Sequence, residues 1–300
     1  GGPRPFENDF LFNPYGCGWH VNRPAFDRML AEAARRAGAG LLLGTTVQRM
    51  TEGAGGRWVI ETKRGAGRAR LTADHVVWAG GRAAGTCGSA RRTARVDRLV
   101  GCAAFFDQSD VSDAAETRAV IEARPEGWWY TSILPGGVLV AALMTDADLV
   151  PGGHDRALEY VGRRLRETEL TGRRLTRAAT PRVFRRFAAD TRWSPAVSAK
   201  LVAVGDAAMT FDPLSSQGVF KALASGLSAA RGLIAARSGN EEALREYADA
   251  MARDFQSYMQ TRSQYYRAEQ RWPASPFWRR RHHPAGFSAV TTHRPTAPVN

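Results

Sequence analysis

The sequence has few cysteines and no long apolar run. The first scarcity argues against disulfide-rich and zinc-binding proteins, and the second argues against membrane-spanning proteins. Its 300 residues include three cysteines, Cys17, Cys87 and Cys102, at wide spacings that fit neither a disulfide framework nor a zinc-binding pattern. We therefore expect no metal site. No apolar segment reaches the length of a membrane span, and the first residues are typical of neither a signal peptide nor a transit peptide. These observations predict a cytoplasmic protein without a membrane partner.

Lysine is also scarce, although the chain is strongly basic. The 42 Lys and Arg residues outnumber the 29 Asp and Glu residues, for a net charge of +13, yet only Lys63, Lys200 and Lys221 are lysines. A basic excess attracts nucleic acid, acidic partners or anionic cofactors. The arginines are spread along the chain and no nucleic-acid-binding motif accompanies them. Their number fits a composition biased toward Arg, Ala and Gly, and we predict no nucleic-acid partner.

A glycine-rich phosphate-binding loop is the third absence. No Gly-x-Gly-x-x-Gly follows an apolar strand anywhere in the sequence. The glycine-rich stretches at 38–40 and 53–56 lack the helix that would have to follow them. A pyrophosphate would therefore find no helix N-terminus of the usual kind here.

The most informative stretch runs from residue 201 to residue 219. Leu201 to Val204 predicts a buried strand, followed by the turn Gly205-Asp206 and then by a loop that opens a helix near Phe220. A carboxylate at the carboxyl end of such a strand can accept hydrogen bonds from sugar hydroxyls. The amides at the helix start favour negative charge, and Gly218 permits a flat ring to approach the backbone. The combination indicates a flavin, although Asp206 alone would also fit the cap of a turn.

The rest of the pattern predicts a mixed α/β chain. Asn22 caps an expected helix that Gly38 ends. Further helices are expected at 156–166, 220–236 and 241–271. In the first part of the chain we expect a buried strand over 41–47, a hairpin over 58–71 and a short strand from residue 76. Four strands are expected at 99–106, 117–123, 128–134 and 138–144, and irregular strand is expected over 181–200.

The run from Gly205 to Gly218 resembles the second flavin-binding motif of FAD-dependent monooxygenases of the para-hydroxybenzoate hydroxylase fold. That superfamily also holds geranylgeranyl reductases and flavin-dependent tryptophan halogenases. Similar segments occur upstream at 18–27, 46–47, 76–82 and 126–135, so that the resemblance covers most of residues 10–240. In the overall character of its sequence, the chain most resembles the monooxygenases that hydroxylate a tryptophan side chain of a partner protein during quinone-cofactor maturation.

The resemblance implies FAD as the cofactor and a specific set of residues around it. The expected cofactor-binding residues are Arg23, Val47, Gly80, Gly81, Gly205, Asp206, Pro213, Ser216, Gln217, Gly218 and Val219. Trp128 and Tyr130 share one face of a strand and are the candidates for the substrate wall, with Trp129 on the other face. Some of these residues also have a structural interpretation. Arg23 could be a surface charge at the start of a helix, and the aromatic residues could belong to the core. His20 is expected to be a structural group rather than a proton shuttle. Lys221 is expected to be exposed to solvent rather than to aid an anionic flavin.

The implied fold is α/β, with an incomplete Rossmann-like FAD-binding domain, an inserted, mostly antiparallel β-sheet substrate domain and C-terminal helices. The expected limits are 1–98 and 201–240 for the FAD-binding part, 99–200 for the substrate domain, and 241–300 for C-terminal helices and tail. Because the glycine loop is missing, the chain begins about a third of a domain late by comparison with the family.

The implied reaction is hydroxylation of an electron-rich aromatic ring through a flavin C4a-hydroperoxide, with NAD(P)H or a separate flavin reductase as electron source. The aromatic substrates that the resemblance implies include the tryptophan side chain of a partner protein. A reductase of the geranylgeranyl type, a halogenase and an inactive fragment are the alternatives. Halogenation is disfavoured because the Trp-x-Trp-x-x-Pro signature is absent, the nearest sequence being Trp128-Trp129-Tyr130. No side chain is assigned as an acid–base catalyst.

Overall fold

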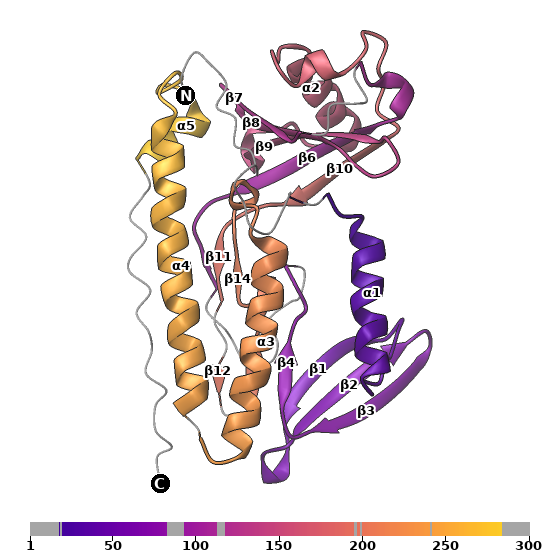
Figure 1. Cartoon of the computed structure of the whole chain (residues 1–300), viewed down its shortest axis with the longest axis vertical. Coiled ribbons are helices and arrows are strands. Elements are labelled where there is room, and N and C mark those ends of the chain that lie inside the picture. Colours follow the sequence, from indigo (N-terminus) through magenta and orange to yellow (C-terminus); the bar gives the residue numbers. More distant parts are fainter. Residues whose placement is uncertain are drawn as a thin grey trace. The chain divides into compact units, whose positions relative to one another are not determined.

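The computed structural model describes residues 18, 20–82, 93–112, 118–194, 197–198, 200–240 and 242–283. The chain divides into two compact units, each with its own sheets and helices (Figure 1). Of the described residues, unit 1 comprises those within 18–41, 100–187 and 266–283, and unit 2 comprises those within 42–99 and 188–265. Both units mix helices with sheets, which confirms the predicted α/β class. Cys17, Trp19 and Cys87 lie outside the described residues.

Unit 1 is built on a five-stranded sheet in the order β10-β6-β9-β8-β7. Neighbours β7 to β9 pair antiparallel, as predicted. The turn into β8 requires Gly127, because a Cβ atom there would lie 2.1 Å from the carbonyl oxygen of Met144. The strands are β6 (Leu99–Phe106), β7 (Val120–Arg124), β8 (Gly127–Ile133), β9 (Leu139–Asp146) and β10 (Val183–Ala188).

Helix α2 (His154–Arg166) buries an apolar stripe of Ala157, Val161 and Leu165 against one face of this sheet. The residues that it covers include Trp129, which is 0% exposed, and Cys102. Helix α1 (Arg23–Arg36) begins at its predicted N-cap, where the Asn22 side chain accepts a hydrogen bond from the amide of Ala25.

The last described segment of unit 1 is the short helix α5 (Pro276–His282). Phe277 and Trp278 are buried, and the Trp278 indole donates a hydrogen bond to the carbonyl of Arg124. Arg280 and Arg281 both pair with the buried carboxylate of Asp146 at the end of β9. These contacts fix α5 against the β7 and β9 strands.

Unit 2 combines three small sheets with two long helices. The antiparallel sheet β1 (Thr46–Glu52), β2 (Trp58–Arg64) and β3 (Gly67–Ala73) contains the predicted hairpin. In the second sheet, β4 (Val76–Trp78) pairs parallel with β13 (Leu201–Ala203), which β12 (Val197–Ser198) joins antiparallel. The third sheet holds β5 (Ala94–Arg95), β11 (Arg192–Trp193) and β14 (Met209–Thr210), and the helices are α3 (Gly218–Arg237) and α4 (Glu242–Ala268).

The core of unit 2 forms where these helices meet the second and third sheets. Val202 and Phe255 are fully buried, and the Phe211 and Tyr258 rings stack with centroids 3.9 Å apart. This packing positions the loop between β13 and α3, which carries five of the eleven predicted cofactor-binding residues. Short 3₁₀ turns complete the described elements: η1 (Ala54–Gly56), η2 (Gln108–Asp110), η3 (Ala147–Leu149), η4 (Gly172–Arg174), η5 (Gly205–Ala207) and η6 (Pro213–Ser215).

The prediction of a buried strand over residues 41–47 is wrong: its second half begins strand β1, but Thr46 and Val47 are exposed, and its first half is not a strand. Leu41, Leu42 and Leu43 lie outside any strand and are exposed, Leu43 by 70%. A turn at Gly44, with φ of +67°, separates them from β1. Three leucines in a row therefore marked a connection rather than a core strand.

Helix α3 is apolar along much of its length. Among the described helices, its composition and its 20 residues meet the criteria for crossing a bilayer, contrary to the sequence-based expectation. Phe220, Leu227 and Ile234 are among its exposed apolar side chains. One helix of this kind is weak evidence for a membrane span, because the core helix of a globular protein meets the same criteria.

Burial protects the thiol of Cys102 chemically. Removal from water raises its pKa to about 11, so that the thiol stays protonated at neutral pH. We predict that iodoacetamide modifies Cys102 much more slowly in the native protein than in guanidinium, as measured by peptide mass mapping. Equal rates in the two solvents would show that strand β6 is not packed as described.

Candidate functional site

The turn after β13 is shaped by its contact with helix α3. Gly205 has φ of +57°, and a Cβ atom there would lie 3.3 Å from the Cβ of Ala222. The Gly205 amide donates a hydrogen bond to the hydroxyl of Ser225, at 2.9 Å. Glycine is therefore required both for the left-handed backbone and for the close approach. The turn places Asp206 at the carboxyl end of the parallel strand pair.

The Asp206 carboxylate is held by two cations. The Nζ atom of Lys221 lies 2.7 Å from one carboxylate oxygen, and the Nε atom of Arg82 lies 3.2 Å from the other. The Asp206 side chain keeps 31% of its surface exposed, whereas that of Lys221 keeps 5%. Asp206 is thus fixed in orientation while remaining open to a ligand on one side.

Lys221 is buried, and the prediction that it is exposed to solvent is wrong. Besides Asp206, its ammonium donates to the carbonyl of Met209 and lies 4.5 Å from the centre of the Phe211 ring. Burial lowers the pKa of Lys221, and the neighbouring Asp206 charge opposes that shift. The helix turns this side chain inward because position 221 faces the η5 turn rather than solvent.

Arg82 connects the two strand ends. It donates to the carbonyl oxygens of Asp190 and Phe211, at 2.6 and 2.8 Å, in addition to its contact with Asp206. The buried Asp190 carboxylate also pairs with Arg95 and Arg192, at 2.6 and 2.7 Å. Sequence reasoning did not single out Arg82, although it directly follows the predicted Gly80-Gly81 turn and that position was the available signal.

The loop before α3 leaves the start of the helix open. Asp212 caps η6 by accepting a hydrogen bond from the amide of Leu214, and Ser216 adopts a left-handed conformation with φ of 53°. No side chain caps α3 at Gln217, and a Cβ atom at Gly218 would have no neighbour within 4 Å. The first amides of a helix lack partners within the helix, so this end of α3 can receive an anionic group.

The structure brings the predicted residues of unit 2 together in part. Gly80 and Gly81 follow β4, and Gly205 and Asp206 follow the adjacent parallel strand β13, so that the two turns meet through Arg82. Lys221 links the Asp206 turn to the first turn of α3, which contains Gly218 and Val219 and follows Pro213, Ser216 and Gln217.

For two further predicted residues, the structure gives no tie to this arrangement. Val47 is exposed on β1 of unit 2, and no contact in the described part of the chain ties its side chain to Asp206. Arg23 belongs to α1 of unit 1, where it forms an exposed ion pair with Asp27. Their assignment to cofactor binding stays a prediction.

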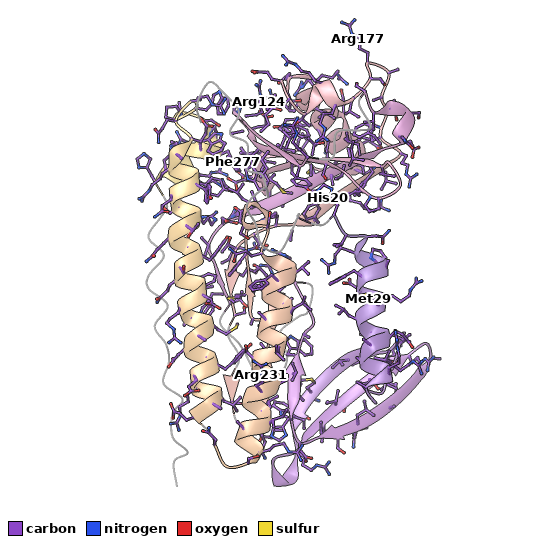
Figure 2. All side chains as sticks on the ribbon, viewed as in Figure 1. His20, Met29, Arg124, Arg177, Arg231 and Phe277 are labelled. Carbon is purple, nitrogen blue, oxygen red and sulfur yellow. The ribbon has the colours of Figure 1, made fainter. Side chains whose placement is uncertain are left out.

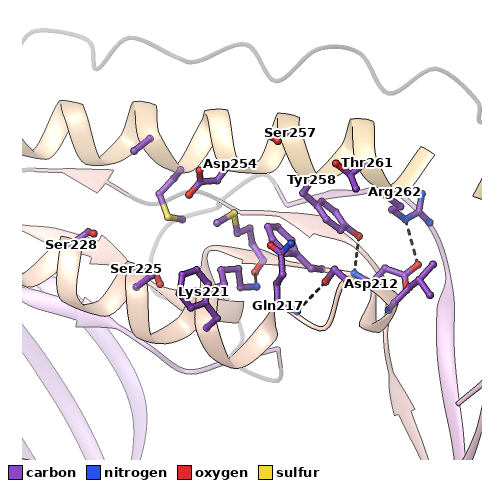
Figure 3. A pocket seen from close by; sticks show the side chains of 18 of the residues that line it. Asp212, Gln217, Lys221, Ser225, Ser228, Asp254, Ser257, Tyr258, Thr261 and Arg262 are labelled. Carbon is purple, nitrogen blue, oxygen red and sulfur yellow. Dashed lines mark hydrogen bonds and ion pairs between the residues drawn. The ribbon is translucent and has the colours of Figure 1, made fainter. Parts of the chain in front are cut away.

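A cavity of about 420 Å³ opens between α3 and α4 within unit 2 (Figure 3). Gln217 and Lys221 line it from the start of α3, and Asp254, Tyr258 and Arg262 line it from α4. Of the predicted cofactor-binding residues, only Gln217 contributes to its wall. Lys221 thus lines this cavity and also pairs with Asp206.

In unit 1 the alternation along β8 is as predicted. Trp129 points into the core beneath α2, and Trp128, Tyr130 and Ser132 share the opposite face. The Trp128 indole donates to the hydroxyl of Tyr266 at 3.0 Å, which makes Trp128 a buried, hydrogen-bonded residue and Tyr130 the more accessible of the two candidates.

His20 precedes α1 (Figure 2) and contacts Ser132, which belongs to the same face of β8. Its Nδ1 atom is 3.0 Å from the carbonyl oxygen of Ile133 and 3.1 Å from the hydroxyl of Ser132. Because a carbonyl oxygen only accepts, this contact places the proton of a neutral His20 on Nδ1. The interaction is a structural anchor for the residue that precedes α1.

Comparison with known proteins gives consistent matches. A model of the tryptophan halogenase family matches residues 5–289. LodB of Marinomonas mediterranea, whose name assigns it as a FAD-dependent oxidoreductase, is 29% identical over 290 residues, covering 93% of this chain and 74% of LodB.

Two solved structures share the fold. The flavin-dependent halogenase CmlS has a TM-score of 0.75 at 22% identity, covering 87% of this chain and 49% of CmlS. The peptidyl tryptophan dihydroxylase QhpG, essential for tryptophylquinone cofactor biogenesis, has a TM-score of 0.66 at 24% identity, covering 90% of this chain and 61% of QhpG. The chain thus spans about half the length of CmlS and less than two thirds of QhpG.

The ion pair at the centre of the site should be measurable in folding stability. We predict that Asp206→Asn lowers the free energy of unfolding by about 1–3 kcal/mol, because the buried Lys221 ammonium loses its charged partner. The double variant D206N/K221M should lose less than D206N alone, since it leaves no unpaired buried charge. Urea unfolding measures both.

Asp74→Asn is the matched control. Asp74 pairs with Arg57 at the surface, with both side chains more than half exposed, so its loss should stay within about 0.5 kcal/mol. If D206N and D74N lowered the free energy of unfolding by the same small amount, the Asp206 ion pair would not contribute to the stability of the fold.

Proposed function

Because this chain belongs to the tryptophan halogenase family, we propose that it is a FAD-dependent hydroxylase of an electron-rich aromatic ring, the indole of a tryptophan side chain in a partner protein. Enzymes of this family are flavin oxidoreductases that use FAD, so the coarse class of the reaction follows from membership. The hydroxylation and its substrate are the proposal, and NAD(P)H or a separate flavin reductase would supply the electrons.

The residues present fit one end of FAD. Asp206 offers a partly exposed carboxylate for the ribitol hydroxyls, and the uncapped start of α3 offers amides for the pyrimidine edge of the ring. Cβ atoms at Gly81 and Gly218 would meet no atom within 4 Å, so the backbone can be approached at both turns. For the pyrophosphate, the sequence holds no Gly-x-Gly-x-x-Gly loop.

The observation that carries the proposal is the joint position of Asp206 and the start of α3 beyond the carboxyl end of β13. When bound, FAD supplies the activation of dioxygen and the transfer of an oxygen atom. The chain would hold the ribitol through Asp206 and stabilise negative charge on the pyrimidine edge through the amides of Gly218 and Val219. Arg82 and Lys221 would keep the Asp206 carboxylate oriented.

An indole substrate is supported by a named relative and by the β8 face. QhpG is described as acting on a peptidyl tryptophan. Tyr130 is partly accessible on the face of β8 opposite to α2, and its aromatic ring suits contact with a flat, electron-rich ring, whereas Trp128 on the same face is buried against Tyr266.

Halogenation is the second candidate, which the family's name and the resemblance to CmlS favour. Against it stands the sequence Trp128-Trp129-Tyr130 in place of a Trp-x-Trp-x-x-Pro signature. Trp129 is sealed in the core beneath α2, so it cannot face a substrate.

The test is to supply the purified protein with FAD, a flavin reductase, NADH, ¹⁸O-labelled dioxygen and chloride, together with tryptophan-containing peptides. We expect labelled oxygen in the indole, detected by mass spectrometry, because in a hydroxylation of this kind the oxygen atom added to the ring would come from dioxygen. Parallel peptides with phenylalanine in place of tryptophan should stay unmodified.

A chlorinated indole would contradict hydroxylation and establish the halogenase. Peptides that stay unmodified while FAD is bound and oxygen is consumed would contradict tryptophan as the substrate. A protein that binds no FAD would contradict the proposal as a whole.

A further inference from the structure

The cavity between α3 and α4 has no role in the proposed reaction, although it has the size of a small-molecule site. Its volume of about 420 Å³ lies within the range of pockets that enclose small organic ligands. It lies wholly within unit 2, since its lining residues all belong to the segment from Met209 to Tyr265. The chemistry of its wall therefore indicates which class of ligand it can bind.

The buried part of the wall is apolar. Met209, Phe211, Met251 and Tyr258 line the cavity, and each is at most 6% exposed. The rings of Phe211 and Tyr258 stack in parallel, with an interplanar angle of 4°. Thioether and aromatic side chains of this kind favour an apolar ligand body and adapt to its shape.

Two large aromatic side chains are exposed where the cavity meets solvent. Phe220 on α3 and Tyr265 on α4 both line the cavity, although they are 73% and 66% exposed. Exposed apolar surface beside a concave site is typical of ligand-binding grooves, because binding removes that surface from water. A ligand with an apolar or aromatic body would therefore gain free energy at both the inner and the outer parts of the wall.

The two cations of the wall already have counter-charges within the protein. The Lys221 ammonium pairs with the Asp206 carboxylate. The Arg262 guanidinium pairs with the carboxylates of Asp97 and Asp212. The partial positive charge at the start of α3 falls off within the first turn of the helix. None of these positive charges therefore requires an anionic ligand.

Asp254 supplies a negative charge without such compensation. It lies on α4 across the cavity from the stretch of α3 that holds Lys221 and Ser225 (Figure 3). Within the part of the chain that the structure describes, its carboxylate forms no ion pair. Ser257 and Thr261 follow one and two turns later on the same face of α4 and add hydroxyl groups to the wall. A carboxylate beside hydroxyl groups and aromatic rings is suited to an ammonium group.

We propose that this cavity is a binding site for a small organic cation, a protonated amine on an apolar or aromatic body. The ammonium group pairs with Asp254, and the body of the ligand contacts the methionine and aromatic side chains of the wall. The inference is independent of the proposed function, because an amine needs no flavin in order to bind here.

The experiment titrates the whole chain, without added flavin, with three probes of similar shape and different charge. The probes are phenethylammonium, neutral 2-phenylethanol and anionic 3-phenylpropionate, and isothermal titration calorimetry measures each dissociation constant. We expect one saturable site for phenethylammonium. The dissociation constants of the other two probes should be larger by about tenfold or more, because they lose the charge-assisted hydrogen bond to Asp254.

Three variants locate the site. Asp254→Asn keeps the size of the side chain but removes its charge, and should abolish the preference for phenethylammonium over 2-phenylethanol. Asp249→Asn is the matched control, since Asp249 is exposed on the same helix and does not line the cavity, and it should leave all three constants unchanged. Ala224→Trp adds a bulky ring to the cavity wall from α3 and should weaken the binding of every probe.

Three results would overturn the inference: no saturable binding of phenethylammonium, equal affinity for the charged and neutral probes, or a preference that persists in D254N. Binding that A224W leaves unchanged would place the amine elsewhere and overturn the assignment of the cavity. Circular dichroism checks that each variant is folded, and D254S takes the place of D254N if D254N does not fold.

Discussion

The site depends on one interaction, the pairing of a buried ammonium with a carboxylate at the end of a parallel strand. Lys221 and Asp206 join helix α3 to the turn after β13, and Arg82 extends the pair to the turn after β4. Breaking one partner leaves a charge in a poorly solvated place, which is costly, so the three side chains fix one another. The same pairing leaves one side of the Asp206 carboxylate exposed, where a polyol can reach it.

Most of the secondary structure could be predicted because it depends on local pattern. The alternation along β8 placed Trp129 on the opposite face from Trp128 and Tyr130, and the Asn22 cap and Gly38 marked the ends of α1 correctly. The stretch at 41–43 failed because three consecutive leucines indicate burial without indicating what would cover them.

The site could be predicted only where one segment carries it. The Gly205-Asp206 turn and the open start of α3 lie in one continuous motif, and both have the predicted local form. The burial of Lys221 and the role of Arg82 depend on contacts between segments far apart in the sequence, as in the bond from Arg82 to the Asp190 carbonyl. A lysine beside a helix start is ordinarily solvated, so its neighbours alone gave no sign that Asp206 would draw it inward.

The central claim is that this corner of unit 2 holds FAD. Titration of the wild type and of Asp206→Asn with FAD, followed by flavin fluorescence, tests it most directly. The account predicts saturable binding that D206N weakens by about 1–3 kcal/mol, or roughly 5- to 150-fold, because the ribitol loses a charged acceptor. Equal affinity of the two proteins would contradict it.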